Sequence, residues 1–488
     1  MGSIIPNRKS KAISPSKRLN TLRERMLAQP DELRFGILRD YYYLEGWLEA
    51  GYQPLPIRNV EALSRVLECM PVKYTEGELL VGEHGGDHEM TNFRPLQPGD
   101  YAERIQASPL LTDAQKKQMV KRVKTEPFAY QLYGSVAPWT EEVRKAQEHA
   151  AIEIWGTDLN HSIRAYEKVL KLGFSGLKAQ VEERLATLDH AMPDAPEQRA
   201  NLLAWHRLCE AASGLGKRHA AELRLRAQLE SDEGKREELE QLATICERVP
   251  EQPATTFHEA LQSLWFAHMI TCWEDNLNAN GLGRMDQYLW PYLEADLSEG
   301  RLDWKKAAEL LGAFWLKLYL PYDVQQAMVG GQLPDGTDAT NPLSYLILDV
   351  TEGMGFVRCL SARLHKGSPR AFVSRCVDLL AKGGGIPFFF NDEALVPALV
   401  AQGLPVEDAR GYAAIGCIEI TLPGMANPHA VSHWINLAKC LEYALNDGKD
   451  MLDGTQVGPQ TGTLADFNTI EDVIAAYKQQ VEYFAPLA

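Results

Sequence analysis

The sequence predicts an α/β fold preceded by a long helical region, and two features of the chain carry this prediction. From about residue 343, short apolar runs alternate with helical stretches, which is typical of an α/β sheet or barrel. The strand-length runs are residues 343–348, 359–364, 387–390 and 413–415, and residues 372–380 form a helical stretch between them. Residues 102–250, in contrast, consist mostly of long amphipathic helical patterns.

The elements before residue 343 are predicted from composition and periodicity. Residues 1–17 are basic and contain Pro6 and Pro15, which indicates a disordered tail. Helical spacing then runs from Arg18 to about Cys69, and residues 78–82 form a short apolar run that predicts a buried strand. Residues 257–273 are apolar on nearly every turn and predict a buried helix.

Composition excludes several classes of function. The 488 residues carry a formal net charge of −16, which would repel a nucleic-acid backbone. No apolar run approaches the length of a membrane span, and the polar, basic N-terminus does not resemble a secretory signal. The eight cysteines include no Cys-x-x-Cys spacing, so we expect free thiols in a reducing cytoplasm and no zinc or iron–sulfur site.

One loop combines a thiol with a carboxylate. Cys417 and Glu419 follow the apolar run 413–415 and precede a turn that contains Pro423 and Gly424. Because side chains alternate along an extended segment, the two would lie on one face and could act on one substrate. Packing of Cys417 as a small apolar group is the alternative, since free cysteines are among the most often buried residues.

Four further groups of polar residues have both a functional and a structural interpretation. His161 stands just before a helical pattern and could contact a substrate or order the helix start. Asp275 ends the apolar helix and could face a cavity or solvent. Arg284 and Asp286 suggest a structural ion pair, and residues 84–89 contain two histidines in a Gly-rich loop. We favour a solvated turn for that loop and expect no metal.

Several of these stretches, taken together, resemble the glycyl radical enzymes of the pyruvate formate-lyase family. One match would be weak, but several in the family's order, from about residue 30 to the end, are specific. The matching segments are Asp158-Leu159-Asn160-His161, Tyr166-Glu167-Lys168-Val169-Leu170, residues 282–289, Val329-Gly330-Gly331, residues 338–346, Leu360-Ser361-Ala362-Arg363, Ile386-Pro387, residues 390–393 and Gly416-Cys417-Ile418-Glu419.

The resemblance implies a ten-stranded α/β barrel surrounded by helices, with the cysteine loop inside and the barrel incomplete here. Residues 18–488 would form this domain, with a helical part to about residue 256 and a barrel part over 257–488. A glycyl radical, installed by a radical-SAM activating enzyme with an iron–sulfur cluster, would turn Cys417 into a thiyl radical. That radical needs a dry cavity and takes hydrogen from a small substrate, while Glu419, enclosed in the barrel, transfers a proton. We also expect a homodimer.

The residues around the cysteine narrow the subclass. Cys417 has Gly416 and Ile418 as neighbours rather than a second cysteine, which argues against acyl transfer. The Gly-Cys-x-Glu pattern resembles the eliminases, most closely dehydratases of the hydroxyproline, glycerol or diol type. His161 and Asp275 would contact substrate, as would His433, which stands where related dehydratases carry a tyrosine. The alternatives within the family are C–N, C–S or C–C lyases, including decarboxylases.

The sequence contains no Arg-Val-x-Gly-Tyr motif, which is the family's radical site. We therefore expect a truncated chain that accepts the radical without making it and is inactive alone unless complemented. Two other hypotheses remain open, an inert fragment or scaffold, and a cysteine hydrolase with His429 or His433 as base. No nucleophile-elbow pattern surrounds Cys417, which argues against the hydrolase.

Overall fold

The structure is a computed structural model. It contains two compact units, which we describe separately. It describes residues 12–28, 36–83, 105–125, 140–154, 161–275, 279–319, 325–355, 359–416, 418–426 and 433–488. Unit 1 comprises residues 1–91, 98–129 and 160–428, and unit 2 comprises residues 92–97, 130–159 and 429–488. The prediction that one domain over residues 18–488 has a helical part to about residue 256 and a barrel part after it stays a prediction.

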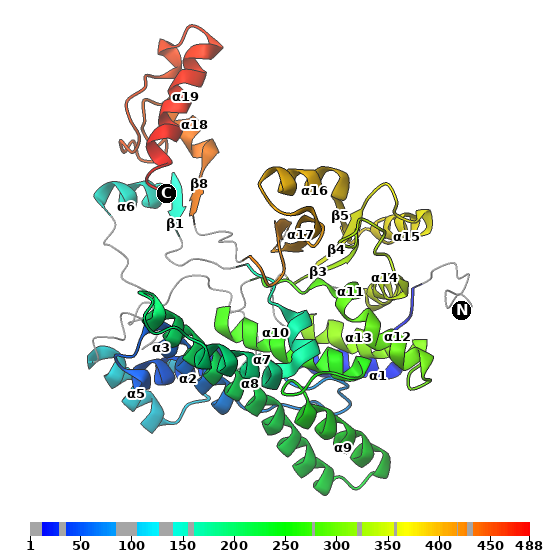
Figure 1. Cartoon of the computed structure of the whole chain (residues 1–488). Coiled ribbons are helices and arrows are strands. Elements are labelled where there is room, and N and C mark those ends of the chain that lie inside the picture. Colours follow the sequence, from blue (N-terminus) through cyan, green and yellow to red (C-terminus); the bar gives the residue numbers. More distant parts are fainter. Residues whose placement is uncertain are drawn as a thin grey trace. The chain divides into compact units, whose positions relative to one another are not determined.

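The helical part of unit 1 is built around one buried helix, α10 (Phe257–Asp275). Leu261, Leu264, Trp265 and Phe266 on α10 are all fully buried, so the helix is covered on every side. It packs against helices that precede it in the sequence and against helices that follow it (Figure 1). The helices of this part are α1 (Lys17–Leu27), α2 (Gly36–Ala50), α3 (Leu55–Cys69), α5 (Asp113–Thr125), α7 (Tyr166–Ala186), α8 (Ala195–Leu229), α9 (Glu233–Arg248), α12 (Trp290–Ser298) and α13 (Trp304–Tyr319).

The sheet of unit 1 confirms the α/β prediction. Four strands pair in parallel in the order β2-β3-β4-β5, with helices in the connections between them (Figure 1). The strands are β2 (Gly283–Arg284), β3 (Gln326–Gly330), β4 (Cys359–Leu364) and β5 (Phe388–Asn391), and the remaining helices are α11 (Met285–Tyr288), α14 (Pro342–Met354), α15 (Arg370–Leu380), α16 (Asp392–Ala401) and α17 (Val406–Ala409). An antiparallel hairpin of β6 (Ala413–Ile415) and β7 (Glu419–Thr421) follows, and β6 contacts β2 and β3.

Two predicted strands are wrong. Residues 343–348 belong to helix α14, which begins with a capping box between Asn341 and Ser344 and has Pro342 in its first turn. Residues 78–82 are buried but form no strand. The backbone of Val81 exchanges both of its hydrogen bonds with the side chain of Gln262 on α10, so a helix side chain takes the place of a neighbouring strand.

The last part of the predicted N-terminal tail is folded. Residues 1–11 lie outside the described residues, but Ile13 donates its backbone N–H to the carbonyl of Asp349. Ser16 accepts a hydrogen bond from Leu19 N and thereby caps α1. Residues 12–17 are therefore part of the folded unit.

Unit 2 has its own small core. Strands β1 (Ile152–Ile154) and β8 (His433–Ile435) pair antiparallel, next to helices α6 (Glu141–Glu148), α18 (Leu437–Leu445) and α19 (Ile470–Phe484) and the 3-10 turn η3 (Leu464–Asp466). Ile152, Cys440, Tyr443 and Phe484 pack together at its centre. The unit therefore joins a segment near residue 150 to the last part of the chain.

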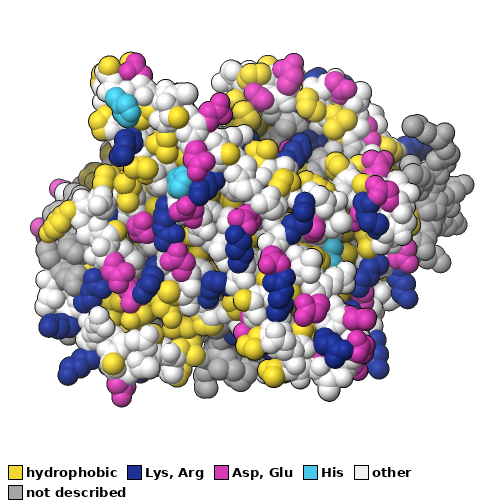
Figure 2. Space-filling model, turned by 60° about the horizontal axis from the view of Figure 1, so that its bottom comes forward, with side chains coloured by type: hydrophobic (Ala, Val, Ile, Leu, Met, Phe, Trp, Pro, Cys, Tyr) yellow, Lys and Arg dark blue, Asp and Glu magenta, His cyan; other side chains and the backbone are white. Residues whose placement is uncertain are grey.

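One face of the molecule is charged but mixed in sign. On the face shown in Figure 2, Lys and Arg side chains are interspersed with Asp and Glu, without a large basic area. Among the described residues, no helix has both the length and the apolarity needed to cross a membrane. The seven cysteines that the structure describes are all free thiols, in agreement with the prediction.

Candidate functional site

The candidate site lies at the turn of the β6–β7 hairpin. Ile415 and Glu419 are paired across the two strands, so residues 416–418 make the turn between them. Gly416 has a φ of +52°, a conformation that suits glycine, and a β-carbon there would lie 2.4 Å from both Glu419 Oε2 and His161 Nδ1. A glycine is therefore needed at this position for two polar side chains to approach the turn.

His161 and Glu419, both predicted from the sequence, meet beside this turn although 258 positions separate them. His161 Nδ1 lies 3.2 Å from Glu419 Oε1, and the backbone N–H of Ile418 donates to Glu419 Oε2 at 3.1 Å. Both carboxylate oxygens are thus held, yet each keeps a free lone pair for a further donor. The imidazole and the carboxylate are placed to pass a proton between them.

Burial sets the charge state of the imidazole. The His161 side chain is 10% exposed, and burial lowers its pKa below the usual range, while the Glu419 carboxylate opposes part of this shift. His161 is therefore neutral near pH 7, as a proton acceptor must be. Glu419, in contrast, has a side chain that is 35% exposed, so our expectation that it is enclosed is wrong for this chain.

The position of His161 is fixed by backbone contacts of its neighbours. Ser162 O accepts from Gly281 N at 2.9 Å, and Ile163 O accepts from Gly424 N at 2.8 Å. On the other side, Gly416 N donates to Ala279 O at 3.2 Å. Residues 279–281 therefore connect the segment that contains His161 to the hairpin turn that precedes Glu419, a link that sequence reasoning missed.

A buried ion pair supports the start of the hairpin. Arg363 on β4 binds Asp392 at the start of α16 through two hydrogen bonds of 2.9 and 2.8 Å, and both side chains are fully buried. The third nitrogen of Arg363 donates to the carbonyls of Arg410 and Tyr412, at 2.8 and 2.7 Å. These carbonyls directly precede β6, so the pair fixes where the hairpin begins.

Arg284 and Asp286 do not form the ion pair that we predicted. Arg284 donates to the carbonyl of Gly330, whereas the Asp286 carboxylate accepts from Gly330 N and from Ser344 Oγ. Burial raises the pKa of Asp286 and lowers that of Arg284 to about 10. Arg284 therefore binds the end of β3, and Asp286 binds the end of β3 and the start of α14.

The remaining predicted site residues stay predictions. Cys417 lies outside the described residues, between Gly416 and Ile418 of the hairpin turn. Asp275 is the last residue of α10, and His433 begins β8 in unit 2, but the structure does not describe either side chain. The structure therefore brings together His161 and Glu419 and leaves the other three unassigned.

Metal ligands were not expected, and one possible group occurs among the described residues. His149, Asp450 and Asp453 of unit 2 place their ligand atoms within 4.8 Å of one another. Lys439 Nζ, however, lies 2.8 Å from Asp450, and this ammonium group already neutralises the carboxylate. The Gly-rich loop with two histidines, residues 84–89, lies outside the described residues.

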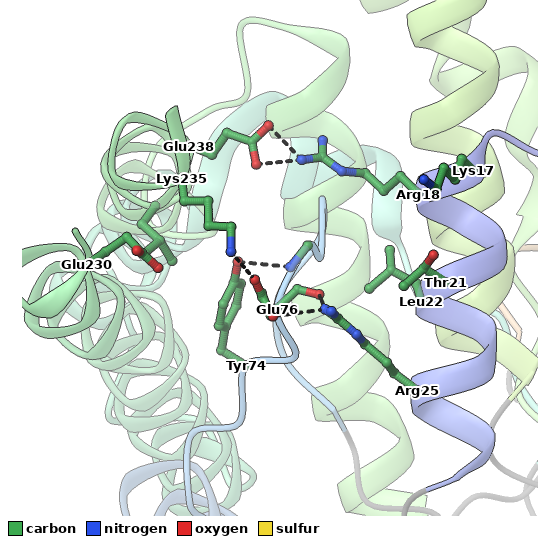
Figure 3. A pocket seen from close by; sticks show the side chains of 12 residues that line it. Lys17, Arg18, Thr21, Leu22, Arg25, Tyr74, Glu76, Glu230, Lys235 and Glu238 are labelled. Carbon is green, nitrogen blue, oxygen red and sulfur yellow. Dashed lines mark hydrogen bonds and ion pairs between the residues drawn. The ribbon is translucent and has the colours of Figure 1, made fainter. Parts of the chain in front are cut away.

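A pocket of about 290 Å³ lies between α1, residues 74–77 and α9 and contains no predicted site residue (Figure 3). Its charged groups bind each other: Arg18 pairs with Glu238, and Glu76 pairs with both Arg25 and Lys235 (Figure 3). Most of the charges that line this pocket are thus matched internally, and it lies apart from the His161–Glu419 pair.

The chain matches known proteins along most of its length. The family model described as pyruvate formate lyase-like matches residues 13–488. An isethionate sulfite-lyase from Nitratidesulfovibrio vulgaris (strain Hildenborough) is 32% identical over 93% of this chain and 60% of its own length. A trans-4-hydroxy-L-proline dehydratase from Clostridioides difficile is 30% identical over 89% of this chain and 58% of its own length.

Solved structures agree with these matches. A structure described as showing 1,2-propanediol dehydration in Roseburia inulinivorans superposes with a TM-score of 0.85 at 27% identity and covers 98% of this chain and 63% of that one. The chain thus spans about 60% of the length of the curated relatives that it matches. It belongs to the pyruvate formate lyase-like family of glycyl radical enzymes, in the branch that contains dehydratases and lyases.

Proposed function

We propose that the chain is the substrate-binding part of a glycyl radical dehydratase acting on a small hydroxylated molecule. The observation that supports this most directly is the His161–Glu419 pair at the turn that also contains Cys417. Loss of hydroxide from a carbon radical requires a proton for the leaving group, and this pair can accept and return a proton at the turn that contains Cys417 in the sequence.

The proposed steps balance as follows. For a vicinal diol such as glycerol or 1,2-propanediol, the thiyl form of Cys417 takes a hydrogen atom from one carbon that carries a hydroxyl group. Glu419 removes the proton of that hydroxyl, while the neighbouring C–O bond breaks and its oxygen leaves as water with a proton from the His161–Glu419 pair. The thiol then returns the hydrogen atom to the product radical. Asp275 and His433 are proposed as further substrate contacts.

The proposal needs a glycyl radical, for which the sequence holds no matching motif. We propose that residues outside this sequence supply it, after installation by a radical-SAM activating enzyme, and that the present chain alone does not turn over. A homodimer in the reducing cytoplasm is part of the same proposal. The seven free thiols among the described residues are compatible with that compartment.

A C–S lyase is the second candidate, because the relatives include an isethionate sulfite-lyase at 32% identity. Sulfite leaves as a stable anion, so C–S cleavage needs no proton on the leaving group, although the substrate hydroxyl still loses one. A substrate panel separates the two candidates better than any single variant.

The test is an anaerobic assay of the chain, complemented with a separately expressed C-terminal segment of the C. difficile dehydratase and an activating enzyme. The substrates are trans-4-hydroxy-L-proline, glycerol, 1,2-propanediol and isethionate, and loss of each is followed by mass spectrometry. We expect consumption of a hydroxylated compound, lost in Cys417→Ser. Turnover that persists in Cys417→Ser, or an organic radical signal with no consumption of any substrate, would contradict the proposal.

Rapid labelling of Cys417 by iodoacetamide at neutral pH would instead support a hydrolase.

A further inference from the structure

A buried glycine, Gly281, lies between two segments that belong to the candidate site. A β-carbon at this position would lie 3.0 Å from Ile163 Cγ1, 3.1 Å from the carbonyl oxygen of Ala414 and 3.3 Å from Ile415 Cγ2. Carbon atoms in good contact are about 3.5–4.0 Å apart, so even a methyl group would press on Ile163 and Ile415. The space at Gly281 therefore suits a residue without a side chain.

The crowded neighbours belong to the segments that carry His161 and Glu419. Ile163 stands two positions after His161. On the other side, Ile415 ends β6 and is paired with Glu419 on β7. A side chain at Gly281 would thus push against both halves of the pair at once.

The contact between these halves has little margin. His161 Nδ1 and Glu419 Oε1 are 3.2 Å apart, and at about 3.6 Å such a contact is no longer a hydrogen bond. A β-carbon at Gly281 would require its neighbours to move by a few tenths of an ångström. Because protein interiors are close-packed and transmit strain, this movement is comparable with the shift that breaks the contact.

The nearby Gly283 does not allow the same inference. A β-carbon there would also lie close to Ile163, 3.1 Å from Cγ2, but Gly283 has a φ of +70°, which is strained for any residue with a side chain. Gly281 is not among the glycines at positive φ. Only the lack of space between the two segments opposes a side chain at Gly281.

We propose that Gly281 is a positioning residue, which lets the His161 segment and the β6–β7 hairpin approach closely enough for the two side chains to exchange a proton. This inference rests on the proposed function and deepens it, because it names a residue that sets the geometry of the proposed proton transfer. Such geometry matters for the rate, since a misplacement of about 1 Å can cost about 100-fold.

The test measures the pKa of His161 in the purified chain by NMR with isotope-labelled histidine, which requires no radical. The Glu419 carboxylate raises this pKa against the effect of burial, so a larger separation lowers it. His161→Gln assigns the signal, and Glu419→Gln gives the pKa without the carboxylate. We expect Gly281→Ala to lower the pKa of His161 from the wild-type value towards that in Glu419→Gln.

A second crowded glycine provides the matched control. A β-carbon at Gly312 on α13 would lie 2.6 Å from Leu19 Cδ1, in the helical part of unit 1. Gly312→Ala therefore also adds a methyl group to a packed interior, but it should leave the pKa of His161 unchanged.

Thermal unfolding shows whether each variant folds. If Gly281→Ala does not, Gly281→Ala/Ile163→Ala takes its place, because it relieves the contact with Ile163 and keeps those with Ala414 and Ile415. Its control is Ile163→Ala alone, and the double variant should have the lower His161 pKa of the two.

Each possible result decides the matter. A fall in the His161 pKa that is specific to Gly281→Ala supports the proposal. A folded Gly281→Ala with an unchanged or higher pKa, or an equal fall in Gly312→Ala, overturns the role of Gly281 and leaves the proposed function standing. Equal His161 pKa values in the wild-type chain and Glu419→Gln would remove the pair that supports the proposed function, and the inference with it.

Discussion

Removal of Asp392 should be among the most damaging single changes in unit 1. Its carboxylate accepts two hydrogen bonds from the fully buried Arg363 guanidinium, and a third of 2.7 Å from the hydroxyl of Tyr412. In Asp392→Ala the guanidinium, which also lies 3.8 Å above the Tyr412 ring, would remain buried without a counter-charge. Breaking a buried pair in this way costs about 3–5 kcal/mol.

The same two elements provide a matched control. Lys366, just after β4, pairs with Glu393 on α16 at 3.1 Å, but the Lys366 side chain is 86% exposed. Glu393→Ala removes a carboxylate one position from Asp392, and an exposed pair contributes at most about 1 kcal/mol. Because solvent screens that pair, the comparison isolates burial as the cause of the difference.

The assay is urea unfolding of each variant, followed by tryptophan fluorescence and circular dichroism. We expect Asp392→Ala to lower the free energy of unfolding by several times the loss in Glu393→Ala. The double variant Arg363→Met/Asp392→Leu, which removes both buried charges, should recover most of the loss. Equal losses in Asp392→Ala and Glu393→Ala would refute the reasoning, because the buried pair would then contribute no more than the exposed one.

Three further predictions concern the site and its surroundings. Gly416→Ala should abolish binding of the hydroxylated substrate, measured by calorimetry, since its β-carbon would overlap the Glu419 carboxylate and the His161 imidazole. Gly355→Ala, also at positive φ but in open space, should leave that binding unchanged. Glu419→Gln should retain the organic radical of the complemented enzyme, seen by electron paramagnetic resonance, but lose turnover, and turnover within about threefold of wild type would contradict its proton-transfer role. The free energy of unfolding should fall as the pH drops from about 6.5 towards 4, because burial lowers the pKa of His219 and of His268 to about 4 and each side chain binds a proton on unfolding. The urea midpoint should therefore depend less on pH in a variant with Gln at both positions. An unchanged dependence of the midpoint on pH in that variant would refute the assignment.

The sequence predicted strands best where apolar runs were short and bounded. Residues 359–364 and 413–415 form strands with the predicted bounds. Residues 343–348 did not, because α14 is apolar nearly all round, and a short apolar run cannot distinguish a buried helix from a buried strand. The pattern Asn341-Pro342 followed by Ser344 was the available signal, since it forms a capping box with proline in the first turn.

The site was predictable only in part. Cys417 and Glu419 were accessible because they are close in sequence, and His161 was assigned through the family resemblance. Nothing in the local pattern around His161 indicates a carboxylate 258 positions later, since the contact arises from the tertiary fold.

The segment after α10 helps to set the positions of both His161 and Glu419. Leu282 N donates to Gln326 O of β3, Gly281 N to Ser162 O, and Ala279 O accepts from Gly416 N, so three neighbouring residues bind the sheet, the His161 segment and the hairpin turn. The distance between His161 and Glu419 is therefore set by this segment and by the sheet beneath it, rather than by the weak attraction of the pair itself. Because Arg363 fixes the other end of the hairpin through the carbonyls of Arg410 and Tyr412, the turn is held from both sides. A glutamate that is 35% exposed can then keep a fixed orientation toward a buried imidazole without being buried itself.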